Sequence, residues 1–440
     1  MLPFHDCAAL LSTGDEVVLG QIADTNARFL AQQLVERGVM PTEHAAVPDD
    51  LDALTDAIER LATRVPLIIM TGGLGPTDGD LTRPALARVL GCTLVEDPAA
   101  RMGLETWLAR RNRAVNERQL RQAQRPSAPG SACLPNAFGT APGLHVVIQR
   151  AGRTIDLFAL PGPPGELRAV FAAQVLPLLR PPPVGHTVRT RLLHVIGIGE
   201  ADAVTKLGDL TKRTAMPLAG ITASGAVLTI RIRYQGSLSV AEADSAIDER
   251  EATVRAALSD MVFATGNATL PSTVLDLLKS QARTLATVES CTGGLIGEHL
   301  TAIPGSSAAY AGGWVTYSNA MKQSQVAVST DLLAQHGAVS AQVATAMARG
   351  GLAAAQSHHA LAVTGIAGPD GGSAAKPVGT VYIAHAFKSP VGEITCDVRH
   401  FLFTGERDEI RLRAARMALA MLYFNLVGRP IGEPKLLWQQ

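Results

Sequence analysis

The stretch from Val288 to Lys322 constrains the chain most, because it places reactive side chains among turns made of small residues. The apolar run that ends at its start is rich in β-branched residues and predicts a strand, and the Ser and Gly that follow predict a turn into a helix. Ser290 and Thr292 stand where a helix would be capped. Gly293 and the glycine after it let backbone or ligand approach closely. We expect an anion to bind here, where free N–H groups meet the positive end of a helix.

Three side chains of this stretch have the chemistry of a hydrolase that needs no metal. If Asn319 begins a helix, Lys322 lies on its first turn and can point back towards Tyr317. A serine hydroxyl is a poor nucleophile until a base removes its proton, and a lysine is such a base when burial lowers its pKa. The structural alternative is that Ser290 only caps a helix, Tyr317 packs in the core and Lys322 is solvated. Spacing alone leaves both interpretations open.

Several motifs in the C-terminal third stand in an order that is typical of one family. They read ESCTGGLIGEHLT, PGSSAAYAGGWVTYSNAMK, HGAVS and VTGIAGPDGG. Together they resemble the C-terminal domain of the CinA family and predict an α/β domain over residues 270–430. Such domains are similar to nicotinamide-nucleotide amidohydrolases, which deamidate nicotinamide mononucleotide to the acid and ammonia. The resemblance therefore implies an amidohydrolase that acts on this nucleotide.

The resemblance also implies roles for individual residues. Ser290 is expected to attack the amide carbon, and Lys322 and Tyr317 are expected to move its proton and help ammonia leave; which group is the general base stays open. Backbone N–H groups of residues 292–293 or of the turn at 305–307 would stabilise the oxyanion. No cofactor is expected for this step. The expected substrate-binding residues are Thr292, Gly293, Gly305, Ser306, Ser307, Thr364, Gly365, Gly368, Lys376 and Arg407.

The five cysteines bear on both compartment and mechanism. Their number is odd and none forms a C-x-x-C pair, which indicates a reducing compartment and no thiolate metal site. Cys291 is an alternative nucleophile, because thiolates react faster than hydroxyls and a helix N-terminus lowers a thiol pKa. No histidine stands beside it in the sequence. We therefore favour Ser290.

Residues 8–90 alternate strand-like and helix-like patterns, which predicts that the N-terminal domain is a doubly wound, mostly parallel sheet with ligands beyond the carboxyl ends of its strands. The motifs STGDE, GQIADTN, TGGLGPT and LPGPPGE occur in order. They resemble the N-terminal domain of the CinA family, which is similar to molybdopterin-binding domains. Some members are metal-dependent ADP-ribose pyrophosphatases, so the resemblance implies this second activity and ADP-ribose as a second substrate.

The same resemblance implies a phosphate site and a metal site. Backbone N–H groups of glycine-rich loops bind phosphates, and we expect them at Gly14, Gly72, Gly73, Gly75 and Thr77. Carboxylates are the ligands of hard divalent cations, and the expected set is Asp15, Glu16 and Asp80. The chain departs from the family pattern at Gly79, where the family carries an acid. Asp78 would have to reach the metal from a different backbone position.

Between these two parts, an Arg-Pro-Pro-Pro run at 180–183 predicts a stiff linker. Residues 184–265 predict a small α+β unit, which is KH-like in the family. It lacks a GXXG phosphate clamp, so we expect a spacer or dimer element and no RNA module. The predicted domains are therefore 1–178, 184–265 and 270–430, and the resemblance implies a homodimer.

Composition limits the possible partners. Lys plus Arg equals Asp plus Glu at 39 each, and aromatic residues are only 4% of the chain, so a nucleic-acid surface is disfavoured. No apolar run reaches membrane-spanning length and no targeting segment is visible, which predicts a cytoplasmic protein without membrane contact. The competing function is a nucleotide- or pterin-binding scaffold, linked to competence or DNA damage, that performs no catalysis.

Overall fold

The computed structural model of the chain describes residues 4–150, 152–181, 187–389 and 392–440. The chain divides into two compact units, residues 1–190 with 234–245 and residues 191–233 with 246–440. The predicted linker at 180–183 lies partly outside the described residues. None of the described helices is both long and apolar enough to cross a membrane.

The N-terminal sheet has six strands in the order β2-β1-β3-β8-β7-β6. The first four are parallel and the last two are antiparallel, which confirms the predicted mostly parallel sheet. Its strands are β1 Cys7–Thr13, β2 Met40–Val47, β3 Leu67–Thr71, β6 Ala132–Leu134, β7 Gly143–Arg150 and β8 Arg153–Leu160.

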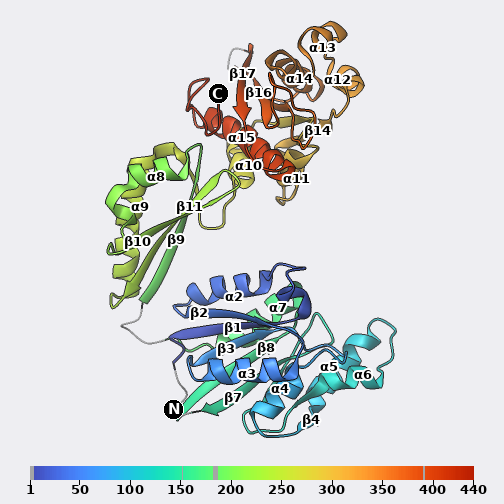
Figure 1. Cartoon of the computed structure of the whole chain (residues 1–440), viewed down its shortest axis with the longest axis vertical. Helices are drawn as coiled ribbons and strands as arrows, with labels where there is room; N and C mark the ends of the chain where they lie inside the picture. Colours follow the sequence, from blue (N-terminus) through green and yellow to red (C-terminus); the bar gives the residue numbers. More distant parts are fainter. Residues whose placement is uncertain (1–3, 151, 182–186, 390–391) are drawn as a thin grey trace. The chain divides into compact units, whose positions relative to one another are not determined.

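Helices cover both faces of this sheet (Figure 1). Helices α2 (Thr25–Val35) and α7 (Pro164–Val170) pack on the face that carries Leu10, whereas α3 (Leu51–Ala62) and α4 (Thr82–Val89) pack on the face that carries Leu11. Side chains alternate between the two faces along a strand, so neighbouring strand residues pack in two separate hydrophobic cores. The remaining elements are α1 Asp15–Val18, α5 Pro98–Ala109, α6 Glu117–Leu120, β4 Leu94–Glu96 and β5 Gln124–Pro126.

The middle segment forms a four-stranded sheet in the order β10-β11-β9-β12. β10 pairs with β11, and β9 with β12, in antiparallel fashion. Its helices and strands are β9 Thr187–Ile196, α8 Glu200–Leu207, β10 Leu218–Ser224, β11 Val227–Gly236, α9 Val240–Leu258 and β12 Val262–Thr265.

The C-terminal sheet has five strands in the order β14-β13-β15-β16-β17. The first three are parallel, so their carboxyl ends share one edge of the sheet, and the last two are antiparallel. The strands are β13 Leu285–Glu289, β14 Tyr310–Val315, β15 His359–Gly365, β16 Thr380–Lys388 and β17 Ile394–Leu402. This edge is where the sequence predicts the hydrolase site.

Two helix layers enclose that sheet. Helix α14 (Ala341–Ala354) packs on one face, and α10 (Leu270–Ser280) with α15 (Arg407–Leu426) on the other. The second half of α15 is buried almost all round, which is typical of a central core helix. The three other helices are α11 Leu295–Thr301, α12 Asn319–Val326 and α13 Thr330–His336.

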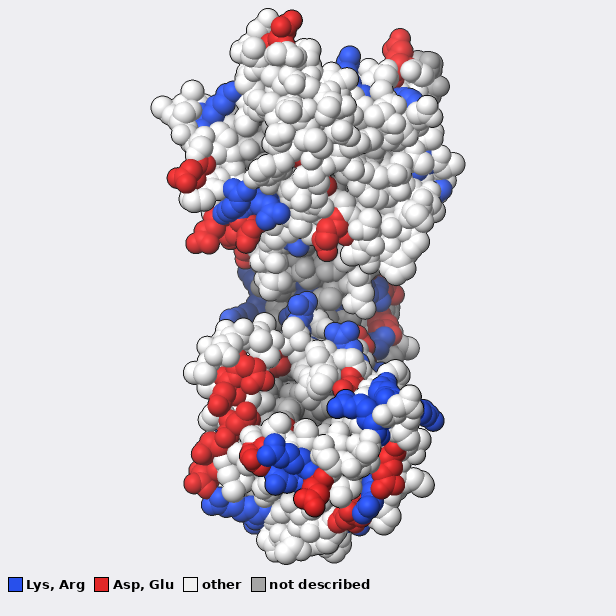
Figure 2. Space-filling model, turned by 90° about the vertical axis from the view of Figure 1, so that its right-hand side faces the viewer, with Lys and Arg blue, Asp and Glu red and all other residues white. Residues whose placement is uncertain are grey.

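Charged side chains of both signs lie close to one another on the face that Figure 2 shows. This mixture agrees with the equal numbers of acidic and basic residues in the chain. A nucleic-acid surface normally gathers positive charge on one face. The face in view therefore gives no support to direct nucleic-acid binding.

Gly350 sets how closely α14 approaches α12. A Cβ atom built at Gly350 would lie 1.9 Å from the carbonyl oxygen of Val326, the last residue of α12. We predict that Gly350→Ala pushes the two helices apart and lowers stability by about 1–3 kcal/mol. Thermal unfolding followed by circular dichroism checks this, with Gly103→Ala in α5 as control. Open space surrounds Gly103, so alanine there should be neutral or slightly stabilising. Equal melting temperatures for Gly350→Ala and the parent protein would contradict the prediction.

Candidate active site

The predicted nucleophile stands directly after a buried strand of the C-terminal sheet. All five residues of β13 are buried, and Ser290 is the first residue beyond it. Gly293 and Gly294 follow with φ angles of 63° and 95°. Few other residues adopt this left-handed region, so the two glycines allow the sharp turn into α11. The predicted strand, turn and helix are therefore all present.

The N-terminus of α11 is already occupied by a carboxylate of the chain. The Glu289 side chain, which is 1% exposed, accepts hydrogen bonds from the N–H groups of Gly294, Ile296 and Gly297 at 3.1, 3.0 and 2.9 Å. These are the groups that we expected to bind an external anion. The expectation of an anion at this turn is therefore wrong, because Glu289 satisfies the helix end itself.

Lys322 lies against the nucleophile, on the first turn of α12. The Ser318 hydroxyl caps this helix by accepting from the N–H of Met321 at 3.2 Å. From there the Lys322 ammonium donates to Ser290 Oγ at 3.1 Å and to the Thr316 carbonyl oxygen at 2.8 Å. The side chain thus points back to the residue before Tyr317, and its amine contacts the serine.

Burial makes Lys322 a candidate base. Its side chain is 1% exposed, and none of the described carboxylates forms an ion pair with it. Removing the ammonium from water lowers the pKa of Lys322 below its ordinary value. The lower pKa increases the fraction of neutral amine near neutral pH, and the neutral amine can take a proton from a hydroxyl.

Tyr317 has a different neighbour from the one that we predicted. It is 61% exposed, and its hydroxyl accepts a hydrogen bond from Arg407 Nη2 at 2.9 Å. Arg407 Nη1 donates to the Gly368 carbonyl oxygen at 2.5 Å. Within the described residues, no hydrogen bond joins Tyr317 to Ser290 or Lys322. The structure thus pairs Ser290 with Lys322 and pairs Tyr317 with Arg407.

The alternative nucleophile, Cys291, is poorly suited to react. Its side chain is buried, and burial raises its thiol pKa to about 12. A thiol with so high a pKa holds almost no thiolate at neutral pH, and the thiolate is the reactive form. The choice of Ser290 over Cys291 thus gains support from the packing.

Several predicted substrate-binding residues lie at the same sheet edge but have partners within the chain. Thr364, next to Gly365 at the end of β15, donates through Oγ1 to the Ala338 carbonyl oxygen at 2.8 Å. Lys376 Nζ donates to the carbonyl oxygens of Val339 and His336 at 2.6 and 3.3 Å. Lys376 therefore tethers two loops together, which weakens its predicted role as a phosphate ligand.

The turn that contains Gly305, Ser306 and Ser307 lies at the opposite edge of the sheet. It precedes β14, and β14 runs parallel to β13 with the start of each strand paired. Ser290 follows β13, so a strand of five residues, about 16 Å long, separates the turn from the nucleophile. Substrate contacts from these three residues of the same chain are contradicted, because the topology places them at the wrong end.

The other turn proposed to stabilise the oxyanion, residues 292–293, also uses some of its polar groups within the chain. The N–H of Gly293 donates to the Ser290 carbonyl oxygen at 3.1 Å. The Thr292 carbonyl oxygen accepts from Arg411 Nη2 at 3.1 Å, whereas Thr292 Oγ1 is buried without a partner among the described residues. The Thr292 hydroxyl thus keeps polar capacity for a ligand.

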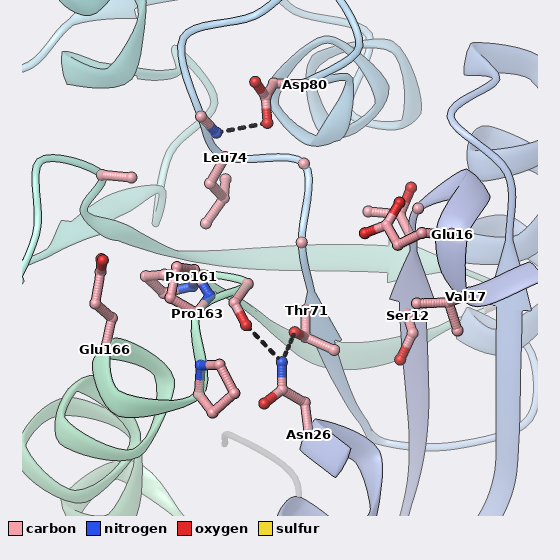
Figure 3. Close-up of a pocket in the computed structure, with 18 of the residues that line it drawn as sticks. Ser12, Glu16, Val17, Asn26, Thr71, Leu74, Asp80, Pro161, Pro163 and Glu166 are labelled. Carbon is pink, nitrogen blue, oxygen red and sulfur yellow. Dashed lines mark hydrogen bonds between the residues drawn. The ribbon is translucent and has the colours of Figure 1, made fainter. Parts of the chain in front are cut away.

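The predicted phosphate-binding loops of the N-terminal domain border a cavity of about 430 Å³ (Figure 3). Most of the expected N–H donors are already used. The N–H groups of Gly14 and Gly72 donate to Val47 and Leu160 at 3.1 Å. Those of Gly75 and Thr77 donate to the Asp80 carboxylate at 2.7 Å. The chain thus supplies its own acceptors, as at Glu289. Gly73 also borders the cavity.

The predicted metal ligands are not gathered around one point. Glu16 folds back over Gly14, and Figure 3 shows it well apart from Asp80. Both Asp80 oxygens accept hydrogen bonds from the loop, and Asp15 Oδ1 accepts from the N–H of Asp49. Within the described ranges, no three His, Cys, Asp or Glu residues are placed to hold a metal ion. The arrangement present does not fit the predicted three-carboxylate site.

Comparison with known proteins identifies the family. The family described as "CinA C-terminal domain" matches residues 267–426, and "Damage-inducible protein CinA KH domain" matches residues 190–264. A "Probable molybdopterin binding domain" matches residues 9–181. A CinA-like protein of Geobacter sulfurreducens is 40% identical over 420 residues, which are 95% of this chain and 99% of that protein. This chain belongs to the CinA family.

Three further proteins are similar to this chain. A CinA-like protein of Syntrophotalea carbinolica is 40% identical over 94% of this chain and 97% of its own length. A solved competence/damage inducible protein from Agrobacterium tumefaciens is 43% identical over 36% of this chain and 93% of that one, with a TM-score of 0.33. The solved CinA from Thermoplasma acidophilum is 28% identical over 40% of this chain and 98% of its own, with a TM-score of 0.36.

Two residues of this CinA chain that shape the site were missed by the sequence analysis. Glu289 ends a buried strand, and a single acid at a strand end gives no sign that it will cap the next helix. Arg411 touches the nucleophile turn from a helix that lies 119 positions further along the chain. Its spacing of four residues from Arg407 is a signal that both face one side of a helix.

Glu289 should be essential to the shape of the nucleophile turn. Glu289→Gln replaces one oxygen by an NH₂ group, which cannot accept from the N–H groups that the carboxylate now satisfies. We predict a loss of about 1–3 kcal/mol, the cost of buried donors without acceptors, seen as a lower melting temperature. The control is Glu298→Gln in α11, the helix whose N-terminus Glu289 caps, because the Glu298 side chain is exposed. Equal melting temperatures for the two variants would refute the capping role.

Proposed function

We propose that the C-terminal domain hydrolyses the carboxamide of nicotinamide mononucleotide to the acid and ammonia. The observation that carries the proposal is the contact between a buried lysine amine, which has no carboxylate partner among the described residues, and a serine hydroxyl 3.1 Å away at the carboxyl edge of the sheet. The motifs that resemble nicotinamide-nucleotide amidohydrolases supply the substrate. The relatives are named as a CinA-like protein and as a competence/damage inducible protein, and these names do not state this activity.

The reaction follows from the two side chains. The neutral Lys322 amine takes the Ser290 proton as Oγ bonds to the amide carbon. The resulting ammonium returns that proton to the amide nitrogen, so the C–N bond breaks and ammonia leaves, with the acyl group held as an ester on Ser290. Water then attacks the ester, Lys322 takes a proton from that water and passes it to Ser290 Oγ as the acyl–oxygen bond breaks, and the acid is released with both side chains restored. No other reactant is needed.

The remaining residues bind and orient the substrate in this proposal. Arg407 carries a positive charge that its present partners, the Tyr317 hydroxyl and the Gly368 carbonyl, leave uncompensated. A phosphate would pair with this guanidinium. Tyr317 is exposed next to it, where its ring can contact the nucleotide. We therefore assign Tyr317 and Arg407 to binding and leave the proton transfer to Lys322.

The other predictions stay untested. The ADP-ribose pyrophosphatase activity lacks support, because Gly79 replaces an acid and the expected metal ligands lie apart. The homodimer and the cytoplasmic location remain expectations. The competing scaffold function predicts binding without ammonia release, so the same assay separates it from the hydrolase.

Ser290→Ala should abolish ammonia release from nicotinamide mononucleotide, because the attacking atom is removed. We expect a loss of at least a thousandfold in kcat with the melting temperature nearly unchanged. The matched control is Ser324→Ala, which removes an exposed hydroxyl of α12 and should retain full activity. Turnover by Ser290→Ala at the parental rate would refute the nucleophile assignment.

The pH profile should report Lys322. Burial lowers its pKa, and the reaction needs the neutral amine, so kcat/KM should rise with pH through a midpoint below the ordinary lysine value of 10.5. Lys322→Met should remove both the activity and this limb, whereas Lys279→Met in α10 should keep both. A profile without such a limb between pH 5 and about 10 would contradict Lys322 as the base.

A further inference from the structure

A two-residue turn of the middle segment lies against the C-terminal domain. It consists of Gly225 and Ala226, with φ angles of 53° and 76°, and it joins β10 to β11. Positive φ at both central residues is common in tight hairpin turns, but it is unfavourable for an alanine. Ala226 and Val227 pack against the hydrophobic core that contains α15. Packing on that core therefore holds the turn in a conformation that alanine rarely adopts.

Arg416 of α15 binds this turn directly. Its Nη1 donates to the carbonyl oxygens of Ser224 and Gly225 at 2.6 and 2.7 Å. None of the described carboxylates forms an ion pair with Arg416, and burial lowers the pKa of its guanidinium. The approach is close, because a Cβ atom built at Gly225 would clash with Arg416 Nη1 and lie 2.8 Å from Leu412 Cδ2. This half-buried cation thus fixes the turn and the helix against each other.

The same helix contacts the hydrolase site through its first turns. Arg411 Nη2 donates to the Thr292 carbonyl oxygen at 3.1 Å, in the nucleophile turn. Arg407, one helical turn earlier, has partners of its own on two loops. Arg416 stands five residues after Arg411, about 7.5 Å along the helix axis. Because both belong to one continuous helix, a contact that fixes Arg416 also limits the movement of Arg411.

The middle segment also contacts the far end of α15. The Tyr423 hydroxyl donates to the Asp260 carbonyl oxygen at 2.9 Å. Arg429, shortly after the helix, donates from Nη2 to Asp260 Oδ1 at 2.6 Å. Residues of the middle segment thus hold α15 at two places along its length, which restrains both sliding and rotation of the helix.

We propose that the turn at residues 224–226 is a positioning element for the hydrolase site, and that Arg416 is the positioning residue through which it acts. By fixing α15, the contact holds Arg411 against the Thr292 carbonyl and keeps Ser290 aligned with the substrate carbonyl. Arg416 does not touch the substrate, so its loss should lower kcat and leave KM nearly unchanged. The inference rests on the proposed amidohydrolase, but order in the nucleophile turn can be measured without turnover.

Hydrogen exchange followed by mass spectrometry, on the full chain without substrate, measures that order. Arg416→Met should speed exchange over residues 290–297 at least fivefold, whereas Arg416→Lys, which can still donate to the carbonyls, should stay close to the parental rate. The control is Lys206→Met, on an exposed position of α8 in the middle segment. Unchanged exchange over residues 290–297 in Arg416→Met would overturn the proposal. Faster exchange spread evenly over the C-terminal sheet would show general destabilisation and would also overturn it.

Turnover separates positioning from stability. At a temperature where every variant is folded, Arg416→Met and Gly225→Ala should each lower kcat for nicotinamide mononucleotide about tenfold and change KM less than twofold. The double variant should lose no more than either single variant, because both changes break one contact. The control is Gly220→Ala in β10, where an added Cβ meets nothing within 4 Å. Parental kcat in Arg416→Met, or additive losses, would refute the proposal. No ammonia release by the parent would refute the amidohydrolase instead, and hydrogen exchange would then decide this inference.

Discussion

The buried contact between the Lys322 amine and Ser290 Oγ is the interaction on which the account of the C-terminal domain depends. An ammonium ion at 1% exposure, whose partners among the described residues are a hydroxyl and a carbonyl, has lost most of its hydration. Such a position is costly unless the group loses its proton readily. Loss of hydration makes the charged lysine costly to bury, and the same loss makes it a base. The energetic cost and the proposed chemistry therefore have one cause.

The contact exists because of the helices around it. Serine capping of α12 begins that helix directly after Tyr317, which turns Lys322 inward, and Gly350 lets α14 approach the other end of α12. On the opposite side, Glu289 closes the N-terminus of α11 and Arg411 contacts the Thr292 carbonyl. The nucleophile turn is thus held from two helices, which limits its freedom before substrate arrives.

Carboxylates of the chain occupy backbone N–H groups in both domains. Glu289 does so at α11, and Asp80 does so in the glycine-rich loop of the N-terminal cavity. From sequence, such loops predict anion binding, because glycine frees the backbone and the pattern does not reveal whether an acid nearby will fold back. Positive charge for a substrate must then come from side chains, and Arg407 is the candidate in the C-terminal site.

Local patterns predicted the elements better than the contacts between them. The alternation of strand-like and helix-like patterns predicted the mostly parallel N-terminal sheet, and the helix expected to begin at Asn319 does begin there. The wrong placement of the turn at 305–307 arose because sequence order does not show on which edge of a parallel sheet a turn lies. The partners of Tyr317 and Lys376 lie 90 and 37 positions away along the chain, so local spacing could not predict them.

The most direct test is an NMR titration of the lysine side chains in the free protein, with the Lys322 signal assigned through its loss in Lys322→Met. Burial without a carboxylate partner predicts a midpoint below 10.5, the ordinary value. A midpoint at or above that value would mean that the amine remains charged where the account requires a base, and would contradict it.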